Sequence, residues 1–143
     1  MSLDKAPSAT AYLEVTGRRV GTNLEYDGLV KISSSGSISA QIRRYTSSSA
    51  ADVTTAVGTG FTYTPGLTLN VRMQATGTSP TTLRMKVWPA SASEPANWQV
   101  TGTDSTASLQ AAGATGFRSY QGGTPGNLPI VLQVDNFAAR PVA

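Results

Sequence analysis

The fold is decided by the stretch Leu67-Thr-Leu-Asn-Val-Arg-Met-Gln-Ala-Thr-Gly-Thr-Ser-Pro-Thr-Thr-Leu-Arg-Met-Lys-Val-Trp88. Apolar and polar residues alternate along 67–76, and they alternate again along 83–88 after the turn signal at 77–80. In a strand, successive side chains point to opposite faces, so a period of two places all apolar residues on one face. The stretch therefore predicts an antiparallel hairpin that covers a core with one face.

The register of this hairpin must bring the two apolar faces together. Paired residues must then have numbers whose sum is even, because a slip of one residue would turn one arm inside out. We expect Val71 opposite Met85 and Arg72 opposite Arg84. Two directly opposed arginines are unfavourable in isolation. The pair predicts either two solvated guanidinium groups that point away from each other or a site that binds an anion.

The same alternation continues on both sides of the hairpin. In 23–33, for example, Tyr26 and Val30 share one phase, and Asp27 and Lys31 share the other. Many short strands separated by turn signals favour a β-sandwich or a barrel. We expect further strands over 11–19, 23–33, 37–45, 116–121 and 129–138, a weaker strand pair or loop over 52–61, a loop over 47–51, and a helical turn or two within 105–112.

Composition excludes several classes of chemistry. The 143 residues include 11 Lys and Arg, 8 Asp and Glu, no His and no Cys, and carry a net charge of +3. A Ser-His-Asp triad and disulfides are impossible within this chain, and the usual zinc ligands are missing. A net charge of +3 is too small to predict nucleic-acid binding. No apolar run approaches the roughly 18 residues of a membrane span.

The run from Thr76 to Leu109 carries a recognisable pattern. It contains Lys86-Val-Trp88, Glu94-Pro95 and Trp98, and is followed by Gly116-Phe-Arg118 and Val134-Asp-Asn-Phe137. This pattern resembles concanavalin A-like, or laminin-G-like, jelly-roll modules found in secreted actinobacterial proteins and phage tail proteins. The resemblance implies one all-β domain over 1–143, an antiparallel jelly-roll β-sandwich. It also implies an extracellular or virion location, with any export signal outside this chain.

The resemblance also concerns the start of the chain. In the modules that the chain resembles, further strands precede the position of Ser2, so the resemblance implies a C-terminal piece of a larger module. A sandwich without its first strands would expose unpaired edges. We therefore expect completion by another chain or self-association. The alternative is a shortened sandwich with a rearranged start.

Aromatic and basic residues on the polar strand phases are the candidate ligand-binding groups. Trp88 lies on such a phase and could stack on a sugar ring, or it could pack beneath the loop that follows it. Arginines can grip an anionic polymer in a bidentate way, or can simply belong to a solvated sheet face. The candidate set is Trp88, Arg72, Arg84, Lys86, Arg43, Tyr45, Asn70, Arg118 and Tyr120. Tyr26 and Phe117 lie on core phases, and Tyr12 is a further accessible aromatic residue.

The carboxylates support weaker alternatives. Glu25 and Asp27 are two apart on one strand face, and a glycoside hydrolase needs two facing carboxylates. The Glu-x-Asp-x-x-Glu pattern of jelly-roll glucanases is missing, and a solvated pair beside Lys31 is the simpler interpretation.

Calcium would need six to eight oxygens, to which Glu94, Asp104 and Asp135-Asn136 could contribute. A structural role, such as Asp104 capping the helical turn, is the simpler interpretation here as well.

The sequence thus predicts a non-catalytic module that binds a polysaccharide or cell-surface glycan or mediates adhesion. Its affinity per site would be weak and would be raised by multivalency. The alternatives are a structural or assembly β-sandwich without a ligand, and a glycoside hydrolase remnant. We expect no nucleic-acid or membrane partner and no cofactor, with calcium as the one alternative.

Overall fold

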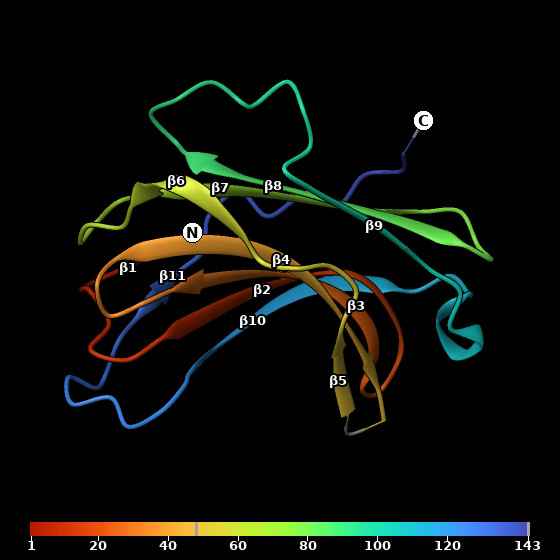
Figure 1. Ribbon diagram of the computed structural model, residues 1–143, viewed down its shortest axis with the longest axis horizontal. Helices are drawn as coiled ribbons and strands as arrows, with labels where there is room; N and C mark the ends of the chain where they lie inside the picture. The colour runs from red at the N-terminus through yellow and green to blue at the C-terminus, as the bar shows by residue number, and fades with distance from the viewer. Residues whose placement is uncertain (48, 143) are drawn as a thin grey trace.

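The computed structural model describes residues 1–47 and 49–142, and it is an all-β sandwich (Figure 1). All the strand pairs among these residues are antiparallel. The strands are β1 (Ser2–Leu3), β2 (Ala11–Gly21), β3 (Leu24–Ile32), β4 (Ser37–Thr46), β5 (Ser49–Asp52), β6 (Val57–Thr62), β7 (Leu69–Thr76), β8 (Thr81–Pro89), β9 (Val100–Asp104), β10 (Ala114–Gln121) and β11 (Leu132–Gln133). One 3₁₀ turn, η1 (Ala107–Leu109), follows β9, within the segment predicted to hold a helical turn or two.

The described residues form three sheets. The six-stranded sheet has the order β10-β2-β3-β4-β5, with β6 also paired to β4. The three-stranded sheet has the order β7-β8-β9 and lies over one face of the larger sheet (Figure 1). Strands β1 and β11 form a small two-stranded sheet. The predicted antiparallel β-sandwich is therefore confirmed.

The core lies between the six-stranded and three-stranded sheets. Tyr26, Val30 and Ile32 of β3 are fully buried, as are Leu83 and Met85 of β8. Burying a side chain of this size contributes about 1.5–3 kcal/mol. The Tyr26 hydroxyl donates a hydrogen bond to Asp104 Oδ1 at 2.7 Å, which satisfies its one polar atom. The alternation in 23–33 thus predicted the inner phase of β3 correctly.

The hairpin register differs from the expected one by two residues. Val71 pairs with Val87, Arg72 with Lys86 and Gln74 with Arg84. The expected register would have placed Pro80 opposite Thr76, and proline has no N–H to donate to a ladder. The two apolar faces still coincide, because the even sum is preserved. The expected Arg72–Arg84 pair is wrong.

Other differences between the predicted and observed elements concern strands at the edges of the sheets. The predicted strand over 129–138 is reduced to β11, and β9 was not predicted. Strand β5 occupies most of the segment predicted as a loop, of which residue 48 lies outside the described residues. The prediction that Phe117 belongs to the core is wrong. Its side chain is 47% exposed, and it meets Phe137 edge-on at 5.6 Å between ring centroids.

No helix in the described part of the chain is long and apolar enough to cross a membrane.

Close packing between the two sheets depends on two glycines. A Cβ atom at Gly28 would lie 3.0 Å from Met85 Sδ and 3.1 Å from Met73 Sδ. A Cβ atom at Gly17 would lie 2.9 Å from Met73 Cγ. The bare backbone at these positions lets the two methionines fill the space between the sheets.

We expect Gly28→Val to lower the free energy of unfolding by about 1–3 kcal/mol, because it overpacks this contact. Gly58→Val is the matched control, since nothing lies within 4 Å of a Cβ atom there. Chemical denaturation of both variants checks the prediction. Equal stability of the two variants would contradict it.

Candidate functional site on the outer face of the six-stranded sheet

Polar side chains gather on the face of the six-stranded sheet that points away from the three-stranded sheet. Arg118 pairs with Glu14 and Tyr120 with Tyr12 across β10 and β2. The pairing continues across β3 and β4. The strands of this sheet are curved, and this face is on their concave side (Figure 1). We call this surface the polar face. Its residues are Tyr12, Glu14 and Thr16 of β2, Glu25, Asp27, Leu29 and Lys31 of β3, Gln41, Arg43 and Tyr45 of β4, and Arg118 and Tyr120 of β10.

Arg118 binds three carboxylates at the centre of the polar face. Its Nε donates to Glu14, its Nη1 donates to Glu25 Oε1 at 3.0 Å, and its Nη2 donates to Asp27 Oδ2 at 3.1 Å. All three acidic residues are fully buried, whereas the Arg118 side chain is 33% exposed. Arg19 also donates to Glu25. We call these five residues the carboxylate cluster: Arg19, Arg118, Glu14, Glu25 and Asp27.

The expectation that Glu25 and Asp27 form a solvated pair is wrong. Taking a carboxylate out of water costs several kcal/mol unless opposite charge and hydrogen bonds compensate. Here Arg118 and Arg19 supply two positive charges to three carboxylates. The cluster would keep one net negative charge if all three acids were ionised.

Asp27 relieves that excess charge. The pKa of Asp27 is raised from 3.8 to about 7, mainly by burial and also by the charges of Glu25 and Glu14, which outweigh the opposing effects of Thr16 and Arg118. Its Oδ1 is buried and has no hydrogen-bond partner among the described residues. A proton on Asp27 therefore leaves the carboxylate cluster neutral.

Aromatic rings lie beside the carboxylate cluster. The Tyr45 hydroxyl donates to Glu14 Oε1 at 3.0 Å, and the Arg118 guanidinium lies 4.2 Å from the Tyr45 ring centroid. Tyr12 and Tyr120 are stacked, with centroids 4.5 Å apart and planes 7° apart. The Tyr120 side chain is 41% exposed. The exposed surface thus combines a guanidinium with aromatic rings held in fixed positions.

Further polar side chains occupy the β3 and β4 side of the face. Arg43 Nε donates to Asp52 Oδ1 at 2.9 Å, and Lys31 Nζ donates to Gln41 Oε1 at 2.6 Å. Both cations are partly exposed. They extend the array of donors beyond the carboxylate cluster.

The predicted ligand-binding residues fall into two separate groups. Arg43, Tyr45, Arg118 and Tyr120 lie together on the polar face. The remaining five lie on the three-stranded sheet, on the phase opposite to its core side chains, which turns them away from the polar face. These five are Asn70, Arg72, Arg84, Lys86 and Trp88.

Lys86 is occupied by the loop that follows its own strand. It is 6% exposed, and its Nζ donates to Glu94 Oε1 at 3.1 Å and to the Pro95 carbonyl at 2.6 Å. The same ammonium lies 4.7 Å from the Trp98 ring centroid. Arg72 binds Glu94 as well, at 2.8 Å. These contacts fasten the loop to the sheet.

The residues considered as calcium ligands have separate roles. Asp104 accepts hydrogen bonds from Tyr26, Arg44 and the Thr106 N–H, and the last of these holds the chain at the start of η1. Glu94 binds Arg72 and Lys86. Within 1–47 and 49–142, no group of three acidic, His or Cys side chains is placed to hold a metal ion.

Sequence reasoning missed Glu14 as a member of the site. Glu14 alternates with Leu13 and Val15 in the predicted strand over 11–19, so its outer phase was readable. Its partners were not, because they depend on β10 pairing with β2 across about 100 residues of chain. Comparisons of this chain with protein-family models, curated proteins and solved structures found no match.

The pKa of Asp27 makes stability depend on pH. The folded protein holds this proton up to about pH 7, whereas the unfolded chain releases it near 3.8. The free energy of unfolding should therefore fall as pH rises between those values, by up to about 4 kcal/mol. We expect Asp27→Asn to remove most of this fall, so that the variant gains most over the parent above pH 7.

Thermal unfolding of the parent and of Asp27→Asn between pH 4 and pH 8 measures the effect. Asp52→Asn is the control, since Asp52 is an exposed carboxylate with a lowered pKa on the same sheet. A parent whose stability stays flat or rises over this range would contradict the assignment.

Proposed function

We propose that this protein is a non-catalytic module that binds carbohydrate, or mediates adhesion through it, on the polar face. The observation that supports the proposal is the arrangement of Arg118, Tyr45 and the Tyr12–Tyr120 stack on the concave side of the curved six-stranded sheet. A sugar ring presents an apolar C–H face to an aromatic ring and hydroxyl groups to hydrogen-bond donors. This surface offers both.

The carboxylate cluster prepares Arg118 for such a ligand. An arginine has five N–H donors, and Arg118 uses three of them on the carboxylates. The other two make no hydrogen bond with residues 1–47 or 49–142 and can meet ligand oxygens. Because the guanidinium is already held by the cluster and by the Tyr45 ring, a ligand would not have to order it, which reduces the cost of binding.

The resemblance to concanavalin A-like modules agrees with this function. It adds the jelly-roll topology, a location outside the cell or in a phage tail, and an array of copies that would raise a weak affinity. These remain parts of the proposal, supported by the Lys86-Val-Trp88 and Glu94-Pro95 patterns and by the sandwich itself.

A glycan array tests the proposal and decides between the two groups of predicted residues. We expect the parent to bind, Tyr120→Ala to weaken binding about tenfold through the lost stacking surface, and Trp88→Ala to bind like the parent. Trp88 is the matched aromatic control because it lies on the other sheet. Binding lost in Trp88→Ala and kept in Tyr120→Ala would contradict the assigned face.

The second candidate function is glycoside hydrolysis. It is favoured by one observation, the raised pKa of Asp27, which is the property of a general acid, next to Glu25 on the same strand. Against it stands the full burial of both carboxylates beneath Arg118. Release of reducing ends from a β-glucan by the parent, lost in Glu25→Gln, would favour the hydrolase over the binding module. A protein with neither glycan binding nor hydrolysis would fit the assembly role instead.

A further inference from the structure

Strand β7 has one free edge. It pairs with β8 on one side, and among the described residues no strand pairs with its other side. The Met1 amino group donates to the Leu69 carbonyl at 2.7 Å, which covers only the first residue of that edge. Unpaired N–H and C=O groups along an edge are a template for another extended chain.

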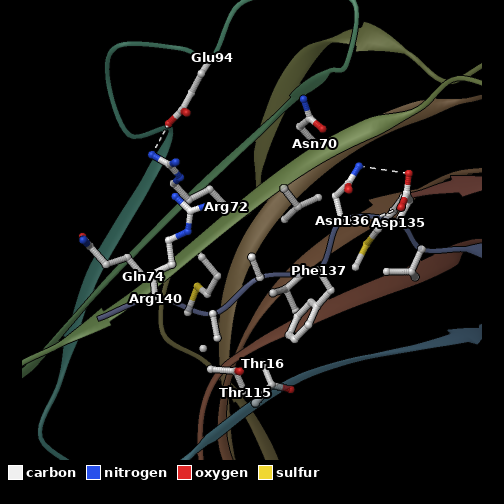
Figure 2. Close-up of a pocket in the computed structure, with 18 of the residues that line it drawn as sticks. Thr16, Asn70, Arg72, Gln74, Glu94, Thr115, Asp135, Asn136, Phe137 and Arg140 are labelled. Atoms are coloured by element: carbon white, nitrogen blue, oxygen red, sulfur yellow. Dashed lines mark hydrogen bonds and ion pairs between the residues drawn. The ribbon is translucent and has the colours of Figure 1, made fainter. Parts of the chain in front are cut away.

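A cavity of about 500 Å³ runs along this edge (Figure 2). Its lining includes every residue from Asn70 to Ala75. Successive side chains of a strand point to opposite faces, so only a cavity beside the edge can contact all six of these residues. The C-terminal segment, with Phe137 and Arg140, lines the opposite wall (Figure 2). The volume lies within the range of ligand sites.

The two sides of the cavity differ in chemistry. On the core phase it is lined by Val71, Met73 and Ala75, together with Val15 of β2. On the outer phase it is lined by Asn70, Arg72 and Gln74. An extended chain placed beside β7 would meet apolar side chains on one phase and polar, basic ones on the other.

The outer rim carries excess positive charge. Arg72 and Lys86 share a single carboxylate, that of Glu94. Arg140 reaches the same rim from the C-terminal segment, and it makes no ion pair with residues 1–47 or 49–142 (Figure 2). The acidic residue Asp135 lies farther along the cavity, beside Asn136 (Figure 2). A ligand carboxylate near Arg72 and Arg140 would therefore be attracted.

We infer that this edge is a strand-addition site for an extended peptide segment of a partner protein. The segment would pair with β7 as a fourth strand of the three-stranded sheet. Its apolar side chains would enter the cavity beside Val71 and Met73, and its acidic side chains would face Arg72 and Arg140. In this mode, main-chain hydrogen bonds supply affinity and the alternating side chains supply specificity. The site shares the lining residue Thr16 with the polar face but lies along another strand, and it does not depend on glycan binding.

The test uses the full chain and the blocked peptide acetyl-Val-Glu-Val-Glu-Val-amide. Amide hydrogen exchange followed by NMR should show slower exchange at alternate residues of β7 when the peptide is present. The same peptide with lysine in place of glutamate should bind at least about threefold more weakly, as expected for exposed ion pairs. A peptide N-methylated at its central valine should give no protection, because it lacks a ladder donor.

Variants of the protein distinguish the contribution of the positive rim from that of strand pairing along β7. Arg140→Ala should weaken the glutamate peptide about threefold, whereas Arg84→Ala should not, since Arg84 lies outside the cavity lining. Unchanged exchange along β7 at saturating peptide would overturn the inference. Equal binding of the lysine peptide would also overturn it, as would a concentration-dependent dimer that protects β7 without peptide, since the occupant would then be a second copy.

Discussion

The arginine of β10 that binds three buried carboxylates is the interaction on which the polar face depends. Arg118 reaches across β2 to Glu25 and Asp27 of β3, which is not its neighbouring strand. Each carboxylate is fully buried, so each would cost several kcal/mol without a partner. The contact therefore fixes where β10 lies along β2, because a shifted β10 would leave buried carboxylates without Arg118.

The same contact links the fold to the proposed function. A guanidinium anchored from below and packed against the Tyr45 ring keeps one geometry, and the Tyr12–Tyr120 stack lies in the neighbouring row of side chains. The core phase of the same strands packs against the three-stranded sheet. Strands β2, β3 and β4 thus use one phase for the core and the other for a polar surface.

The sequence predicted most of the strands and their phases, because a period of two can be recognised within a single segment. This pattern predicted, for example, that Tyr26 lies on the core side of its strand. The site depends instead on which strands become neighbours, and alternation contains no information about that. Four of the predicted residues, among them Arg118 and Tyr120, meet only because β10 pairs with β2, while Trp88 lies on the other sheet.

Alternation also could not predict which of the outer-phase and core-phase side chains are buried. Glu25 and Asp27 lie on the outer phase, where solvation is the ordinary expectation, and they are buried because Arg118 and Tyr45 lie over that phase. Phe117 lies on the core phase and is exposed, because no strand within the described part of the chain extends the three-stranded sheet beyond β7 to cover it.

The most direct measurement is the free energy of unfolding of Arg118→Met and of Arg43→Met at pH 8. The account predicts a loss of about 3–5 kcal/mol for Arg118→Met, because three buried carboxylates lose their counter-ion. It predicts a loss below about 1 kcal/mol for Arg43→Met, whose partner Asp52 is exposed. Similar small losses for both variants would contradict the account, because they would show that Arg118 forms only surface ion pairs.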